Sequence, residues 1–291
     1  MKTDNVVFEM LIGSLKAGKL NEVTSLLGKY SAPLILDNKL AGSGTLIKCG
    51  KAHGILTAHH VIHNPKDRSR VFDFRWSSKQ QLGLTLVEYP HLFRIPMNSL
   101  HCVDIGVPQN GDECDGPDLS VIIFPENVIS EITARKSFFN VSIRREERLA
   151  GCSNNNGLWC AVGNPKFYES SMLPSHGFSE VVDLRGIVLY TAISKRELRR
   201  DFDYIHLNVN YPDLVGDAAL PDRFGGLSGG GVWRLSLIKA TANSQPEIDL
   251  LSACLAGVVY CETLRDGRPE ELRCHGPRSI YNRVCEALPS K

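Results

Sequence analysis

Residues 225–233 read GGLSGGGVW, a stretch in which one serine, Ser228, stands among five glycines and is followed by the apolar Val232 and Trp233. Glycines let the backbone turn sharply and direct several N–H groups toward one point. The apolar pair after them is typical of the start of a β-strand. The stretch therefore predicts a serine on a tight turn ahead of a strand, beside N–H groups that can stabilise an oxyanion.

Two upstream segments carry the residue types that such a serine needs. Residues 42–47 and 54–62 read GSGTLI and GILTAHHVI, a predicted β-hairpin that ends in His60. Residues 116–123 read GPDLSVII and place Asp118 at the mouth of an apolar strand. A serine hydroxyl needs a base to take its proton, a histidine suits this task near neutral pH, and a carboxylate fixes the histidine's tautomer.

In order and context these segments resemble the chymotrypsin/trypsin-like serine proteases, and their bacterial and HtrA-type branch more closely than the digestive enzymes. The patterns GSGxLI, ILTAxHV, DLxV and GxSGG follow the family's order of histidine, aspartate and serine, within roughly residues 32–287. The resemblance implies a serine endopeptidase that acts through an acyl-enzyme. It makes His60 the general base, Asp118 the orienting acid and Ser228 the nucleophile, with the N–H groups of Gly226 and Ser228 as the oxyanion hole.

Each motif also has a plainer interpretation. His60 could be a packed core histidine, Asp118 a turn residue with Asp115 and Asp104 as the fallback acids, and Ser228 part of a flexible turn. The pattern GxSxG also fits the nucleophile elbow of α/β-hydrolases, but that fold needs an acid and a histidine after the serine, and only His275 follows. A protease-fold binding module without catalysis is the alternative from another functional class.

The sequence departs from the family at several positions. Leu227 replaces the acid that precedes the serine in digestive members, and Gly42 and Val61 stand where a cysteine pair flanks the histidine. We expect the likeness to the HtrA-type branch to stop at the catalytic core, without a PDZ-like domain after it. For substrate binding, the resemblance points to Asp222, six residues before the serine, where a carboxylate would favour Lys or Arg substrates unless Arg223 pairs with it. It also points to residues 255–260, which include Val259 and Tyr260, as the strand that lines the specificity pocket.

Short apolar segments separated by turns predict an all-β chain of two antiparallel six-stranded barrels, as the resemblance also implies. Leucine and valine spacing predicts a short N-terminal helical extension over about residues 5–28. The predicted domains are the extension at 1–31, a first barrel at 32–130, a connection at 131–156 and a second barrel at 157–291. The predicted strands are residues 44–49, 54–58, 71–76, 82–88, 119–124, 158–162, 181–193, 204–209, 231–235 and 250–260.

Composition narrows the remaining possibilities. The 291 residues include 33 Lys and Arg against 32 Asp and Glu, so the net charge of +1 offers no bulk attraction for nucleic acid or a membrane. The nine cysteines are scattered without a metal-binding spacing, which predicts reduced thiols, no metal and a cytoplasmic protein. No cofactor is expected. The expected partner is a protein or peptide substrate, and residues 1–30 could either bind a regulatory protein or pack on the barrel.

Overall fold

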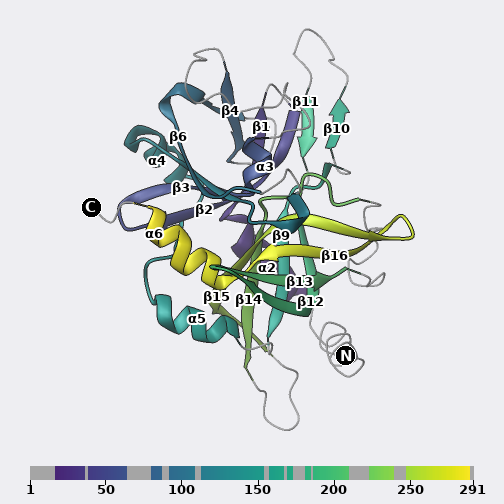
Figure 1. Cartoon of the computed structure of the whole chain (residues 1–291). Coiled ribbons are helices and arrows are strands. Elements are labelled where there is room, and N and C mark those ends of the chain that lie inside the picture. Colours follow the sequence, from purple (N-terminus) through teal and green to yellow (C-terminus); the bar gives the residue numbers. More distant parts are fainter. Residues whose placement is uncertain are drawn as a thin grey trace.

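The computed structural model describes residues 17–36, 39–63, 80–86, 92–108, 113–153, 157–166, 169–172, 181–184, 186–209, 223–238 and 247–288. The chain is mostly β-structure with a few short helices. One sheet occupies the upper half of Figure 1 and a barrel the lower half. The predicted strand at 71–76 lies outside the described residues, and the predicted domain boundaries stay a prediction.

The first half of the chain forms an eight-stranded sheet. Seven strands follow the order β5-β4-β1-β2-β3-β7-β6, and β8 pairs with β2 in parallel. Among the described residues, β6 and β5 at the two ends of this order do not pair with each other, so the sheet is not closed. The predicted six-stranded first barrel is therefore not confirmed. The strands are β1 (Ser31–Leu36), β2 (Lys39–Cys49), β3 (Ala52–Thr57), β4 (Gln81–Thr85), β5 (Leu92–Pro96), β6 (His101–Gly106), β7 (Leu119–Ile123) and β8 (Phe139–Asn140).

The second half forms a closed antiparallel barrel of six strands, as predicted for this half. Its order is β12-β13-β16-β15-β14-β9, and the apolar side chains of Trp159, Trp233 and Leu255 are buried in its core. A separate hairpin pairs β10 (Glu169–Met172) with β11 (Val181–Leu184). The barrel strands are β9 (Leu158–Gly163), β12 (Ile187–Arg199), β13 (Phe202–Asn208), β14 (Gly231–Ile238), β15 (Glu247–Arg265) and β16 (Arg268–His275).

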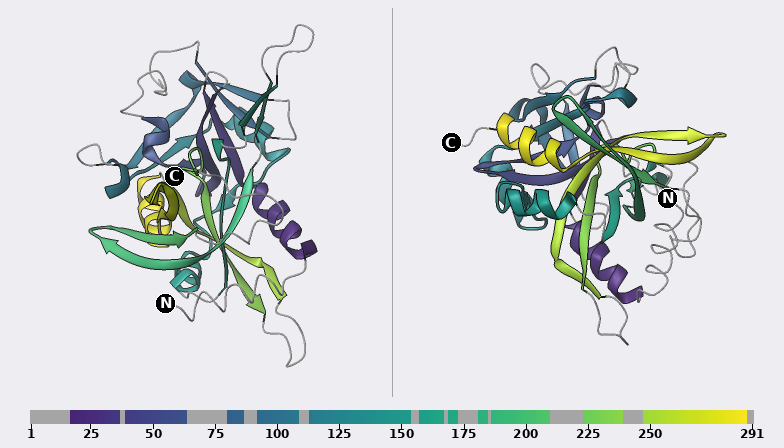
Figure 2. Two further views of the ribbon diagram at one scale, coloured as in Figure 1. Left: turned by 90° about the vertical axis from the view of Figure 1, so that its right-hand side faces the viewer. Right: turned by 60° about the horizontal axis from the view of Figure 1, so that its bottom comes forward.

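Short helices cover the barrel and join the two halves. Helix α2 (Ala17–Gly28) buries Val23 and Leu27 in the barrel core, and its Leu20 carbonyl accepts a hydrogen bond from the Tyr190 hydroxyl at 3.1 Å. Figure 2 shows α2, in purple, beside strands of the barrel. The other helical segments are α3 (His59–Ile62), η2 (Met97–Ser99), η4 (Glu113–Asp115), α4 (Glu126–Thr133), α5 (Arg145–Ser153), η6 (Ser279–Val284) and α6 (Cys285–Ala287).

The predicted helical extension is therefore present from Ala17 onward, and residues 1–16 lie outside the described part. Among the described helices, none has the length and apolar character needed to cross a bilayer.

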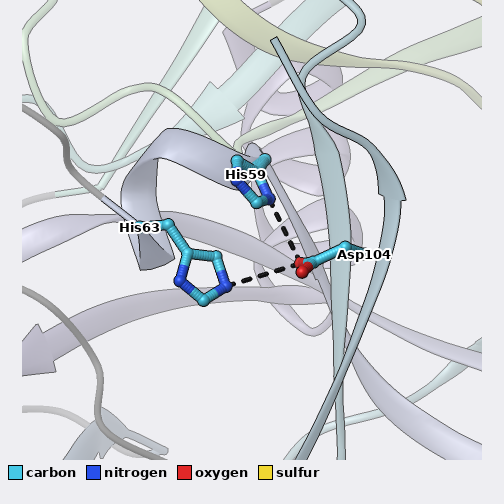
Figure 3. Close-up of side chains that lie close together, drawn as sticks. All are labelled: His59, His63 and Asp104. Carbon is cyan, nitrogen blue, oxygen red and sulfur yellow. Dashed lines mark hydrogen bonds and ion pairs between the residues drawn. The ribbon is translucent and has the colours of Figure 1, made fainter. Parts of the chain in front are cut away.

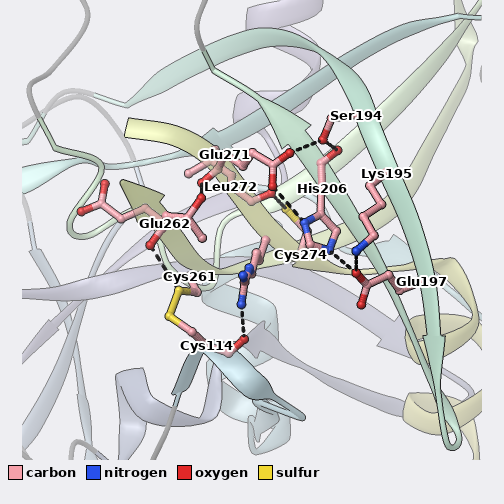
Figure 4. Close-up of polar contacts among 12 residues, drawn as sticks. Cys114, Ser194, Lys195, Glu197, His206, Cys261, Glu262, Glu271, Leu272 and Cys274 are labelled. Carbon is pink, nitrogen blue, oxygen red and sulfur yellow. Dashed lines mark hydrogen bonds and ion pairs between the residues drawn. A yellow bond between two sulfur atoms is a disulfide. The ribbon is translucent and has the colours of Figure 1, made fainter. Parts of the chain in front are cut away.

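A disulfide joins the two halves, which corrects the prediction that all cysteines are reduced. Cys114 in η4 is bonded to Cys261 on β15, at a sequence separation of 147 and with 5.5 Å between their Cα atoms. Figure 4 shows the bond next to Glu262. The prediction was wrong because it rested on sequence spacing, whereas the fold brings two distant cysteines together.

Removing this bond should lower stability. A disulfide restricts the unfolded chain, and for a loop of this length we expect Cys114→Ser/Cys261→Ser to lower the free energy of unfolding by about 2–5 kcal/mol. Urea denaturation without reductant measures the loss. Wild-type protein in excess reductant should match the double variant, and Cys102→Ser, which removes a free thiol, should retain the wild-type midpoint. Equal midpoints for wild type and the double variant would contradict the expectation.

Candidate functional site

Strand pairing positions His60 next to Asp118. Strand β3 lies between β2 and β7, and its last residue, Thr57, pairs with Ser120 on β7. Helix α3 begins two residues after Thr57, and Asp118 precedes β7 by one residue. Because antiparallel pairing sets the register of both chain segments, the continuation of β3 and the approach to β7 bring the two side chains together.

The contact between His60 and Asp118 is made twice. The Nδ1 atom of His60 lies 2.5 Å from Oδ2 of Asp118, and the backbone N–H of His60 donates to Oδ1 at 2.8 Å. The Asp118 side chain is fully buried. Of the two fallback acids, Asp104 contacts His59 at 3.1 Å, and Asp115 accepts a hydrogen bond through its carbonyl from Arg199. The carboxylate that contacts His60 is therefore that of Asp118.

His275 supports Asp118 from the barrel. Its Nε2 accepts a hydrogen bond from the Asp118 backbone N–H at 3.0 Å, so its proton lies on Nδ1. Burial lowers the pKa of His275 to about 4, since a charged imidazolium is poorly solvated there. The rings of Phe202, Tyr204 and Tyr260 pack around it. The uncharged His275 can therefore accept from Asp118 at neutral pH.

The glycines around Ser228 are required by the conformation of the loop. Gly226 and Gly229 have φ angles of +94° and +87°, in the region that favours glycine. A Cβ atom at Gly229 would lie 1.9 Å from the Ser43 carbonyl oxygen. Ser43 also fixes the loop, because its N–H donates to the Ser228 carbonyl and its hydroxyl donates to the Gly226 carbonyl, both at 2.8 Å. Only glycine fits at position 229.

Three N–H groups of this loop have no protein acceptor among the described residues, those of Gly225, Gly226 and Ser228. The N–H of Leu227 donates to the Phe224 carbonyl, and that of Gly229 donates to the Val259 carbonyl. The three available groups include the two donors that the resemblance assigns to the oxyanion hole.

His60 and Ser228 line one cavity of about 220 Å³. The Ser228 side chain is half-buried, and its hydroxyl lies 3.5 Å from the Tyr260 carbonyl oxygen. The predicted binding residues Val259 and Tyr260 also line this cavity, whereas Asp222 lies outside the described residues. The remaining lining residues are Cys114, Phe224, Gly225, Cys261, Glu262 and Leu272.

Glu262 was not found by the sequence analysis. It accepts the Phe224 N–H at 2.7 Å and pairs with Arg223 at 3.6 Å. The basic residue that was considered a partner for Asp222 therefore pairs with Glu262. The only sequence signal for Glu262 was its position just beyond the predicted pocket strand.

The structure also describes the residues that depart from the family pattern, Gly42, Val61 and Leu227. A Cβ atom at Gly42 would lie 2.7 Å from Cγ1 of Val61, so these two positions are neighbours, as a cysteine pair there would be. Leu227, which replaces the acid before the serine, is fully buried. One group of three metal-ligating side chains is present among the described residues, His59, His63 and Asp104.

Comparisons with known proteins do not show a family. No protein-family model and no curated protein matches the chain. A solved structure concerned with the coupled folding and binding of the Sesbania mosaic virus VPg protein has 12% identity and a TM-score of 0.46, covering 90% of this chain and 92% of that chain. The Drosophila Grass clip serine protease of the Toll pathway has 12% identity and a TM-score of 0.43, covering 89% and 68%. Both likenesses are distant.

The buried His275 predicts a pH dependence of stability. Its pKa is lowered from 6.5 to about 4 in the folded chain, so the unfolded chain binds the proton first as the pH falls. The contribution of the neutral His275 to the free energy of unfolding is fully present above pH 6.5. It is lost between pH 6.5 and about 4, and the loss amounts to about 3 kcal/mol. His275→Gln keeps an acceptor but cannot be protonated. Denaturant unfolding at several pH values should therefore show a smaller acid loss in the variant, and equal losses would contradict this assignment.

The loop conformation predicts a contrast between two glycines. Gly229→Ala should lower the free energy of unfolding by at least about 2 kcal/mol, because the added methyl group meets the Ser43 carbonyl at a positive φ. Gly225→Ala is the matched control, since a Cβ atom there meets nothing within 4 Å. Thermal and urea unfolding of both variants measure the difference. Similar stability of the two variants would show that the loop is not held as described.

Proposed function

We propose that the chain is a serine endopeptidase in which Ser228, His60 and Asp118 hydrolyse peptide bonds through an acyl-enzyme. The observation that carries this proposal is the cavity that His60 and Ser228 line together, with Nδ1 of His60 held 2.5 Å from the buried Asp118 carboxylate. A histidine oriented by a buried acid beside a serine is the arrangement that activates a hydroxyl nucleophile.

The two ring nitrogens of His60 then have different tasks. Because Nδ1 donates to Asp118, Nε2 is the basic atom. It takes the proton of Ser228 Oγ as that oxygen attacks the substrate carbonyl, and it delivers this proton to the amine that leaves. A water molecule then attacks the acyl-enzyme with His60 again as the base, which releases the acid and restores the serine. Asp118 remains ionised throughout and stabilises the charged imidazolium.

The oxyanion is assigned to the N–H groups of Gly226 and Ser228. Both belong to a loop whose carbonyl groups at these two residues are held by Ser43. Donors that are already fixed need no reorganisation as charge develops, which is the main source of their effect on rate. The position of these two donors depends on the conformation of Gly226, whose φ of +94° other residues rarely adopt.

The substrate is proposed to be an extended peptide whose side chain enters the cavity beside Val259 and Tyr260. Glu262 lines the same cavity, and its carboxylate lies 3.6 Å from the guanidinium group of Arg223. A preference for Lys or Arg through Asp222 is a further part of the proposal. A peptide library tests it, and an aliphatic preference that Asp222→Ala leaves unchanged would remove it.

The role of the N-terminal segment in regulation and the location of the protein also stay proposals. Helix α2 already uses Val23 and Leu27 in packing on the barrel, which favours the structural interpretation of this segment over a role in partner binding. Disulfides persist mainly in oxidising compartments. The Cys114–Cys261 bond therefore weighs against the predicted cytoplasmic location.

The proposal is tested by labelling with a fluorophosphonate probe, which reports an activated serine without knowledge of the substrate. Wild-type protein should be labelled on Ser228, and Ser228→Ala and His60→Ala should not be. With a cleavable peptide as substrate, kcat of these two variants should fall roughly 10⁴–10⁶-fold. For Asp118→Asn, kcat should fall about 10⁴-fold, because His60 then takes the wrong tautomer.

Two controls separate a lost nucleophile from a lost fold. Ser99→Ala and His101→Ala change exposed residues of the same types and should be labelled like wild type. Circular dichroism and thermal unfolding establish that each variant is folded. A folded wild type that neither reacts with the probe nor cleaves denatured protein would overturn the proposal and favour a protease-fold binding module.

A further inference from the structure

Three metal-ligating side chains converge beside the segment that carries His60. His59 begins α3 and His63 follows its last turn, so the two histidines are spaced i, i+4, and Asp104 comes from the neighbouring strand β6. Figure 3 shows both rings directed at one carboxylate. His59 Nδ1 lies 3.1 Å and His63 Nε2 3.5 Å from the same Asp104 oxygen, and the three ligand atoms all lie within 4.8 Å of one another.

The two distances to the Asp104 oxygen are close to the spacing of ligands around one ion. Zinc binds imidazole nitrogen and carboxylate oxygen at about 2.0–2.2 Å, so neighbouring ligands of a zinc tetrahedron are about 3.3–3.6 Å apart. Two imidazoles and one carboxylate form a donor set that suits divalent transition metals. We propose that His59, His63 and Asp104 bind one such ion, with Zn²⁺ as the best fit and a water molecule as its fourth ligand.

The surroundings hold these ligands in place before an ion arrives. The hydroxyl of the fully buried Ser120 donates to Asp104 at 2.8 Å, which orients the carboxylate. The His59 ring is almost entirely buried, and the rings of His59 and His63 pack with their centroids 4.6 Å apart. The Nε2 atom of His63 is buried as well. Little ordering of side chains is therefore needed on binding.

Binding requires a change of tautomer at His59. In the ion-free chain, Nδ1 of His59 lies 3.1 Å from the Asp104 oxygen. When the metal binds, the neutral His59 ring carries its proton on Nε2, and the Nδ1 lone pair and the Asp104 oxygen both become ligands. The ion then connects α3 to β6, and His60 lies between the two histidine ligands in the sequence. The metal site involves only the first half of the chain, and it does not depend on the proposed hydrolase activity.

Metal titration of the full chain tests the site. The protein is treated with EDTA, the EDTA is removed, and Zn²⁺ is added in a calorimeter, with Co²⁺ as a spectroscopic substitute. We expect one ion per chain with a Kd of about 1 μM or tighter, a tetrahedral Co²⁺ spectrum and a rise in Tm on Zn²⁺ addition. His63→Gln and Asp104→Asn should weaken binding at least about 100-fold, and Ser120→Ala about 10–100-fold.

The control is His101→Gln, which removes an exposed histidine of the same strand as Asp104 and should bind like wild type. Of the two histidine ligands, His63 is better suited to substitution, since its side chain is 33% exposed and that of His59 is 11% exposed. Circular dichroism in EDTA establishes that each variant is folded. Wild-type protein that shows no saturable Zn²⁺ or Co²⁺ binding overturns the proposal by itself. Saturable binding that folded His63→Gln or Asp104→Asn retains would place the ion elsewhere and overturn it too.

Discussion

The buried carboxylate of Asp118 is the interaction on which the rest of the site depends. An ionised group without solvent is costly unless its oxygens accept hydrogen bonds and a charge partner is close. Here both oxygens accept from His60, through the ring and through the backbone, and the Asp118 N–H donates to His275 on the barrel. The hydrogen bonds of Asp118, through its carboxylate and through its backbone N–H, thus connect a residue of α3 with a residue of the barrel.

The Ser228 loop obeys a second constraint of the same kind, in which one half of the chain fixes the other. Ser43 on β2 binds the carbonyl groups of Ser228 and Gly226, so the loop between Phe224 and β14 is held by the first sheet. The Cys114–Cys261 bond adds a covalent connection at the wall of the same cavity. The cavity therefore exists only where both halves meet, and its shape depends on their packing.

His59 and His60 show how adjacent residues acquire different chemistry from their surroundings. His60 contacts the fully buried Asp118, whereas His59 contacts Asp104, whose side chain is 40% exposed, together with His63. The backbone turn at α3 sends the two side chains to different carboxylates. The sequence analysis treated Asp104 as a fallback acid for His60, but it belongs to this separate group, which only the pairing of β6 with β7 brings to α3.

The sequence by itself determined the local features, because these depend on neighbouring residues. The apolar segments of β3, β7, β9 and β14, the glycine turn around Ser228 and the choice of Asp118 as a candidate acid were all evident from short motifs. Only the tertiary structure decided the contacts between distant segments: the Cys114–Cys261 bond, the support of Asp118 by His275, the place of Glu262 and the gathering of His59, His63 and Asp104. Such contacts depend on strand register and on how the sheet packs against the barrel. The spacing of residues along the sequence reveals neither the register nor this packing.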